Sequence, residues 1–211
     1  LFSNEKVAAE LRTEYKKTFK AEFGPCTAFL GVTVERDCKH GLVHTHQTAK
    51  IEALAEKWLP QDCPLRRSPP DRPCDEKLAS LVSPAAQKTY EECPPRLKQA
   101  FQSLIGALLY LALCKRGDCA YAVGLLGRAA HNPTPELMER ALIVLAFMLS
   151  TAGEKTSYDG ARGLLLTAYS DASFEEWGAT SGVLLMLCGA AVAALSKRQR
   201  CVTTSTCSPS W

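Results

Sequence analysis

The sequence of 211 residues lacks a long uncharged hydrophobic run. Its longest uncharged apolar stretch, residues 178–196, has a strongly apolar part of about 14 residues, whereas a helix needs about 20 to span a bilayer. The opening residues carry a charge at Glu5, which is not typical of a signal peptide. We therefore expect no membrane partner, and a protein that is intracellular, cytoplasmic or nuclear, and not secreted. Because the sequence does not begin with Met, we interpret it as a fragment or a processed product.

The net charge is also small, and the sequence has no closely spaced cysteine pairs. The formal net charge of +3 does not indicate a nucleic-acid-binding protein, although it is compatible with local basic patches. None of the 10 cysteines forms a C-x-x-C pair, so reduced thiols are expected. The densest cluster of metal-ligand types is Cys38, His40, His44 and His46, of which the last two would share one strand face. A polar hairpin with Gly41 in its turn is the alternative interpretation.

Three elements are predicted in the first part of the chain. Residues 4–23 favour an amphipathic helix with Asn4 as its N-cap. The apolar residues of this helix recur at every fourth position: Val7, Leu11, Tyr15 and Phe19. Residues 27–36 alternate and are rich in β-branched residues, so they are expected to pair with residues 41–47 in a hairpin. Residues 48–59 return to a helical pattern.

Proline then separates this part from a helical one. Residues 60–95 hold eight of the twelve prolines, which predicts an extended connection with one short helix near residues 75–81. Residues 96–151 have the pattern of three helices joined by short loops, which is typical of a small antiparallel bundle. Asp118 is predicted to cap the second helix. Thr134, followed by proline, is a strong start signal for the third.

The pattern changes again after Gly153. Three short apolar runs separated by turns predict successive antiparallel strands within residues 162–197. Asp171 follows the first of these runs. From the residues alone it is either a metal-binding catalytic carboxylate or an acid that caps a turn.

Basic residues gather just after the third predicted strand, at Lys197, Arg198 and Arg200. They could contact a nucleic-acid backbone, where Lys and Arg supply affinity without reading sequence. A solvated strand end is an equally good interpretation.

Residues 108–148 closely resemble the region that follows the reverse transcriptase core in copia-type retrotransposon polyproteins. The resemblance rests on motifs in one order: LYL at 109–111, RGD at 116–118, AYAV at 120–123 and NP at 132–133. Glycine replaces the family's usual proline at position 117. The flanking sequences FLGVTVERD and HTHQTAKIEAL resemble the end of the family's palm leading into the thumb. YSDAS, TSG and SKRQ resemble the opening of its ribonuclease H domain.

The resemblance implies an α+β fold with four parts along the chain. These parts are the end of a reverse transcriptase palm and start of the thumb (1–60), a Pro-rich connection (61–95), a helical thumb and connection bundle (96–151), and the first three antiparallel strands of a truncated ribonuclease H-like domain (152–211). The hairpin around Phe29, Leu30 and Gly31 resembles the primer grip, which holds nucleic acid. The family uses Mg²⁺ or Mn²⁺, and its partners are a template-primer or RNA–DNA hybrid and the remaining polyprotein segments.

The resemblance also implies that catalytic parts are missing. The family's polymerase site uses a Tyr-x-Asp-Asp turn, and the N-terminal segment here has no Asp-Asp pair. Asp171 aligns with the first metal-binding aspartate of ribonuclease H, but Ser208 and Ser210 stand where the family has its next acids. Glu175 and Glu176 are interpreted as solvated charges in a hairpin connection. We therefore expect Asp171 to be an inherited catalytic position and a weak metal ligand, with no ion bound productively.

The activity expected of this chain is accordingly uncertain: its family is RNA-directed DNA polymerase and ribonuclease H, and the chain alone is expected to be inactive. The alternative is a non-catalytic helical interaction module that uses the apolar surface of residues 97–149.

Overall fold

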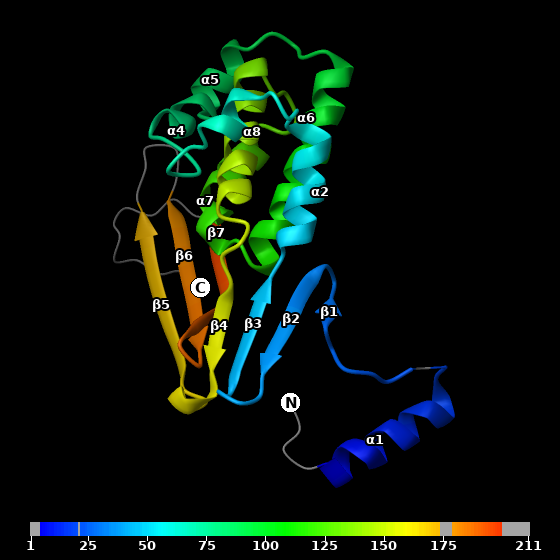
Figure 1. Ribbon diagram of the computed structural model, residues 1–211. Helices are drawn as coiled ribbons and strands as arrows, with labels where there is room; N and C mark the ends of the chain where they lie inside the picture. The colour runs from blue at the N-terminus through cyan, green and yellow to red at the C-terminus, as the bar shows by residue number, and fades with distance from the viewer. Residues whose placement is uncertain (1–4, 21, 174–178, 200–211) are drawn as a thin grey trace.

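The computed structural model describes residues 5–20, 22–173 and 179–199. The chain is mixed, with 47% of its residues in helices and 23% in strands, as expected of an α+β protein. Figure 1 shows a group of helices at one end of the molecule and two sheets at the other, with the N-terminal helix standing apart.

The N-terminal helix α1 (Glu5–Thr18) forms where the four-residue periodicity predicts it, but it is shorter than expected. Its apolar stripe is not buried, because Val7, Leu11 and Tyr15 remain 43–51% exposed. Asn4, the predicted cap, lies outside the described residues. In this chain α1 therefore presents an apolar stripe to its surroundings.

The first sheet contains the predicted hairpin and one strand from much later in the sequence. Its order is β1 (Ala28–Phe29), β2 (Val32–Asp37), β3 (Leu42–His46) and β4 (Thr156–Asp159), and all neighbours are antiparallel. Strand β4 was not expected from the sequence. It pairs with β3 through Thr45 opposite Thr156 and Val43 opposite Tyr158, so residues over a hundred positions apart share one sheet.

The helical body surrounds the main hydrophobic core. Its long helices are α2 (Thr48–Trp58), α6 (Pro95–Cys114), α7 (Ala120–Arg128) and α8 (Pro135–Ser150). Helix α2 packs on α8, and α6 packs on α7 and α8. The Pro-rich connection contains α3 (Pro64–Arg67), α4 (Lys77–Leu81) and α5 (Pro84–Thr89), of which only α4 was predicted.

Of the two predicted helix caps in this body, one is confirmed and one is wrong. Thr134 caps α8, and its Oγ1 accepts a hydrogen bond from the Leu137 amide at 3.2 Å. Asp118 does not cap α7, which has no side-chain cap. Asp118 lies instead in the short 3₁₀ turn η1 (Gly117–Cys119), where it pairs with the Arg116 guanidinium at 2.7 Å. A charged guanidinium makes a stronger hydrogen bond to a carboxylate than a neutral backbone N–H does, so Asp118 pairs with Arg116 and does not cap the helix.

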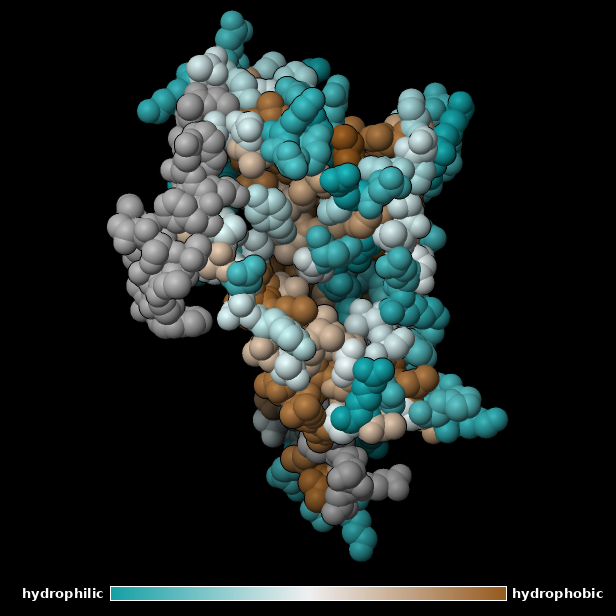
Figure 2. Space-filling model, turned by 90° about the vertical axis from the view of Figure 1, so that its left-hand side faces the viewer, coloured by the Kyte–Doolittle hydropathy of each residue, from teal (hydrophilic) through white to brown (hydrophobic). Residues whose placement is uncertain are grey.

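The second sheet consists of β5 (Leu166–Ser173), β6 (Thr180–Leu187) and β7 (Ala190–Arg198), in that order and antiparallel. This confirms the three predicted strands and excludes a helix across residues 180–198. A second 3₁₀ turn, η2 (Gly160–Arg162), connects β4 to this sheet. Seen from the side of β5, the surface carries hydrophobic residues in the lower part of Figure 2.

Within the described ranges, α6 is the one helix whose length and composition would allow it to cross a membrane. Its residues Phe101, Leu104 and Leu108 are 0% exposed in the core of the helical body. One face of α6 is thus buried against other helices, and a core helix of a globular protein is apolar for this reason.

Candidate functional site

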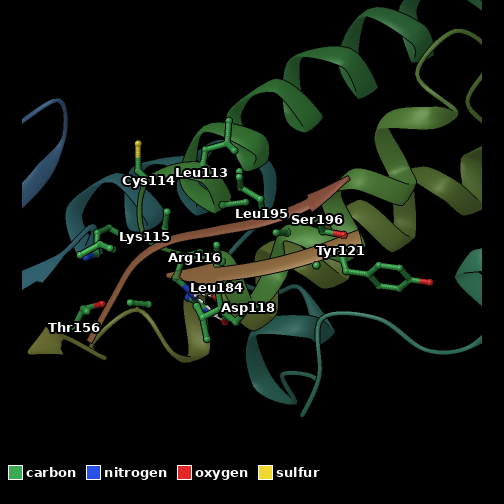
Figure 3. Close-up of a pocket in the computed structure, with 18 of the residues that line it drawn as sticks. Leu113, Cys114, Lys115, Arg116, Asp118, Tyr121, Thr156, Leu184, Leu195 and Ser196 are labelled. Carbon is green, nitrogen blue, oxygen red and sulfur yellow. Dashed lines mark hydrogen bonds and ion pairs between the residues drawn. The ribbon is translucent and has the colours of Figure 1, made fainter. Parts of the chain in front are cut away.

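A cleft of about 970 Å³ lies between the helical body and the second sheet (Figure 3). One wall is formed by β3, β4 and the start of α2, a second by the connection between α6 and α7, and a third by β5, β6 and β7. Of the predicted site residues that the structure describes, Asp171 and the candidate metal ligand His46 line this cleft.

Asp171 lies on β5, where its side chain is exposed. One carboxylate oxygen, Oδ1, accepts a hydrogen bond from the Ala172 amide at 2.8 Å. Its neighbours across the sheet are Gly182 on β6 and then Ser196 on β7, neither of which carries a charge. Asp171 is thus a single carboxylate among neutral neighbours.

No group of three or more His, Cys, Asp or Glu side chains that could hold a metal ion is present in the described part of the chain. The residues weighed as partners for Asp171, namely Glu175, Glu176, Ser208 and Ser210, lie outside that part. The described geometry therefore offers a divalent ion one carboxylate at this position.

The cluster of Cys38, His40, His44 and His46 lies in a polar hairpin, which was the alternative to a metal site. Gly41 takes a positive φ of 67° in the turn, and Cys38 is exposed there. The ring of His40 bonds to Asp37 within the same turn, with Nδ1 at 2.6 Å from Oδ2. This hydrogen bond is the largest cause that lowers the pKa of Asp37.

The other two histidines share one face of β3, as predicted, but each has its own partner. Nδ1 of His44 lies 2.7 Å from the Ser157 hydroxyl on β4. His46 lies between Thr48, at 2.8 Å from Nδ1, and Glu35, at 3.2 Å from Nε2. These imidazoles thus connect strands to each other and to α2.

Glu35 is the centre of a small polar network on that face. It accepts a hydrogen bond from Lys155 at 2.6 Å and also contacts His46. Lys155 first and His46 second lower the pKa of Glu35. Thr48 extends the network by donating to the Ala152 carbonyl at 2.6 Å, which joins the hairpin to the end of the helical body.

The hairpin that resembles a primer grip is anchored at its tip. Leu30 and Gly31 form the turn with positive φ angles of 49° and 74°. The Tyr110 hydroxyl of α6 donates to the Leu30 carbonyl, and the Lys50 ammonium lies 5.4 Å from the centre of the Tyr110 ring. Phe29 and Leu30 then project outward, 66% and 67% exposed.

The basic residues lie elsewhere. Lys197 and Arg198 are exposed at the end of β7, and Arg200 lies outside the described residues. Arg198 lines a cavity with Val82 and Arg128 of the helical body, whereas Phe29 lies in β1, at the edge of the first sheet. The structure does not combine the predicted nucleic-acid-binding residues into one surface.

Arg116 has a role that was missed in the sequence. Its side chain is only 12% exposed, and it pairs with Asp118 through two nitrogens. It also donates to the Met148 carbonyl at 3.1 Å and to Thr151 at 2.8 Å, and it stacks on the Phe147 ring. Burial, the largest single cause, disfavours the charged form, but Asp118 together with Cys119 and Glu154 outweighs it, so the pKa of Arg116 is raised. The RGD motif thus fastens the connection between α6 and α7 to the end of α8.

Gly117 allows the second sheet to approach this connection. A Cβ atom at position 117 would lie 2.3 Å from the Cβ of Ala194 on β7, which is too close for any side chain. The glycine that departs from the family pattern is therefore required by the packing of β7.

Comparison with known proteins shows what this chain is similar to. It is 28% identical over 206 residues to the retrovirus-related Pol polyprotein from transposon TNT 1-94 of Nicotiana tabacum, covering 94% of this chain and 15% of that protein. It is 34% identical over 128 residues to a putative transposon Ty5-1 protein of Saccharomyces cerevisiae, covering 58% of this chain and 42% of that protein. No family model and no solved structure matches.

The chain is thus similar to retrotransposon Pol polyproteins, which supports its origin as a transposon-derived polyprotein fragment. It spans about 15% of the length of the tobacco polyprotein. It is also 36% identical over 109 residues to secreted RxLR effector protein 161 of Plasmopara viticola, covering 50% of this chain and 77% of that protein.

Proposed function

We propose that this chain is the part of a copia-type polyprotein that joins the reverse transcriptase to the ribonuclease H domain. In this proposal it binds a template-primer or an RNA–DNA hybrid through the nucleic-acid backbone, but neither extends a primer nor cleaves the hybrid by itself. The observation that carries the inactivity is Asp171, a single carboxylate with the uncharged Gly182 and Ser196 across the sheet.

The physical reason is the charge of the metal ions. In two-metal catalysis two divalent cations lie about 3.5–4 Å apart. Their repulsion and lost hydration must be offset by several anionic oxygen ligands. One exposed carboxylate cannot supply this, and the sequence contains no Asp-Asp pair for a polymerase site. Mg²⁺ or Mn²⁺ would meet only weak, solvated coordination at Asp171.

Binding without catalysis is supported by the exposed cationic side chains at the end of β7. Lys197 and Arg198 project from the sheet, and Arg200 follows them in the sequence. Such groups release counterions from phosphates, so affinity falls steeply as salt rises. Phe29 and Leu30 offer a separate, apolar contact at the hairpin tip.

The test is hybrid cleavage and hybrid binding by the purified chain. We expect no cleavage with Mg²⁺ or Mn²⁺, and binding that weakens on changing Lys197 and Arg198 to Ala. The matched control is Lys16→Ala with Lys17→Ala on the exposed face of α1. Metal-dependent cleavage that Asp171→Asn abolishes would overturn the proposed inactivity.

A second function, a non-catalytic interaction module, is favoured by a separate observation. A match over half of this chain covers 77% of a relative named as a secreted effector, so that short protein consists largely of a segment similar to part of this chain. The surface expected for such a module, residues 97–149, is largely buried in the core of the helical body, contrary to that expectation. The exposed apolar stripe of α1 is the surface that remains for such interactions. Size-exclusion chromatography distinguishes the two: a clean monomer that melts cooperatively favours a self-contained module, and soluble aggregate favours an incomplete piece of a larger assembly.

A further inference from the structure

The cleft contains a buried carboxamide without a hydrogen-bond partner in the described chain. Gln47 is 3% exposed, and its Nε2 and Oε1 are both unpaired among the described residues. The Thr45 hydroxyl oxygen is buried and unpaired in the same sense. Both residues line the cleft, so an amide with donors and an acceptor and a hydroxyl that can do either lie buried beside its wall.

The cleft extends along the end of β3, where Thr45, His46 and Gln47 all line it. Side chains alternate along β3, so Thr45 projects from the face opposite to His44 and His46. Thr45 is paired with Thr156 of β4, which also lines the cleft and is labelled in Figure 3. Gln47 follows Thr45 by two residues, at the entrance to α2.

The backbone of Gln47 is fixed, whereas its side chain has no structural task in the described chain. Its carbonyl accepts from the amides of Lys50 and Ile51, both at 3.0 Å, which starts α2. Its side chain makes no capping hydrogen bond. A buried polar group left unpaired destabilises a fold, because it has lost its bonds to water. Such a residue is typical of a binding site rather than a core.

We propose that Gln47 and Thr45 form a subsite for the edge of a nucleobase. A nucleobase edge is planar and uncharged, and it presents a donor beside an acceptor. A glutamine amide can make two parallel hydrogen bonds with it. Gln47 reaches the base by rotating about its side-chain torsions, while its backbone stays in place. The ligand class rests on the proposed function, but binding at this subsite needs no metal and no phosphate.

The charges that line the cleft balance one another, which suits an uncharged ligand. Three cationic side chains, Lys115, Arg116 and Lys155, face three acidic ones, Asp118, Glu154 and Asp171. Arg116 pairs with Asp118, Lys155 pairs with Glu35, and Lys115 donates to the Tyr158 hydroxyl at 2.9 Å.

The remaining walls suit the flat faces of a base. Ile51 and Ala112, both 2% exposed, border the cleft near Gln47, and Leu184 of β6 lines it from the second sheet. The volume of about 970 Å³ is at the upper end of the range typical of small-molecule sites and accommodates a whole nucleoside.

The experiment uses the complete chain with adenosine, guanosine, cytidine and uridine, each at millimolar concentration, followed by saturation-transfer NMR and by melting temperature. We expect at least one nucleoside to bind through its base protons with little dependence on salt. Gln47→Met keeps the side-chain volume but removes the donor and the acceptor. It should weaken that binding at least tenfold and raise the melting temperature of the free protein by a few degrees, because the unpaired amide is gone.

Two further variants sharpen this test. Thr45→Val removes the second unpaired group with little change of shape and should also weaken binding. Gln87→Met is the matched control, because Gln87 is likewise unpaired among the described residues but lines a separate cavity of about 300 Å³. It should leave nucleoside binding unchanged.

The inference is overturned if no nucleoside binds, if Gln47→Met binds nucleosides as well as the wild type, or if Gln47→Met melts at a lower temperature, since the amide would then be paired in solution. Binding of nicotinamide but of no nucleoside would also overturn it, in favour of a general carboxamide pocket. The proposed hybrid binding depends on Lys197 and Arg198 and weakens as salt rises. If the chain binds nucleosides but does not bind the hybrid, the proposed function is refuted and this subsite still stands.

Discussion

The helical body and the second sheet of this chain differ in how far their apolar side chains are buried. In the body, Leu104, Leu108 and Leu145 are completely buried. In the second sheet and the segment that leads into it, Leu165 and Leu166 remain 74% and 61% exposed. Leucines occur in both regions, so the difference lies in what covers them.

This contrast indicates which region contributes most to the free energy of unfolding of the chain. The body has partners on several sides, because α2, α6, α7 and α8 bury one shared core. Of the second sheet, β7 contacts the body most closely, whereas β5 forms an edge with mostly exposed side chains. We expect the body to control the stability of the whole chain and the sheet to contribute through its contact at β7.

The largest effect should come from opening a cavity in the body. Leu108→Ala removes a fully buried side chain and should lower the free energy of unfolding by about 2–5 kcal/mol. Leu165→Ala, the same change at an exposed site, should alter it by less than about 0.5 kcal/mol. Urea denaturation of both variants measures the difference. Equal losses would mean that the sheet has a core of its own in solution, and the comparison would fail.

Arg116→Met tests how the body is fastened to its own connections. The change removes the bonds to Asp118, Met148 and Thr151 while it keeps an apolar stem beside Phe147. We expect a loss of about 2 kcal/mol, in the range for hydrogen bonds to a charged group. Arg140→Met, at a more exposed ion pair with Asp75, is the control and should cost less. A smaller effect at Arg116 than at Arg140 would show that the buried cluster does not hold the connection.

The regular parts of this architecture could be predicted from the sequence, because their signals are local. Periodicity indicated the helices of the body and the three strands of the second sheet, and Thr134 marked a helix start. Strand β4 could not be predicted, since Thr156–Asp159 is short and polar and becomes a strand only by pairing with β3. The prediction that Asp118 caps a helix was wrong for a related reason. Asp118 forms an ion pair with the nearby Arg116, and helix-capping preferences do not include such a pair.

The candidate site was less predictable. Asp171 was recognised by its motif, but the cleft around it is assembled from three distant segments, and nothing in the local pattern at Gln47 marks an unpaired amide. Hydrogen-bond satisfaction depends on which segments come together, so this information appears only in three dimensions.

Gly117→Ala probes the boundary between the two regions. The added Cβ would collide with Ala194, so β7 must shift away from the body. We expect a loss of about 1–3 kcal/mol, as for other overpacked sites. Ala194→Gly should restore much of this loss when combined with Gly117→Ala, which a double-mutant cycle measures. Absence of any rescue would mean that the sheet does not pack against residue 117.

The smallest effect concerns the acid stability of the network that joins the first sheet to the body. Lys155, followed by His46, lowers the pKa of Glu35 below its ordinary value of 4.5. A lowered folded-state pKa gives stability that is present above the unfolded-state value and is lost as the pH falls through the folded-state value. Melting temperature between pH 3 and pH 7 should therefore fall more steeply at the acid end for the wild type than for Glu35→Gln. Lys155→Met should reduce the same acid dependence, because it removes the main cause of the shift. Identical acid limbs in all three proteins would show that Glu35 titrates as it does in the unfolded chain, and that the junction depends on packing instead.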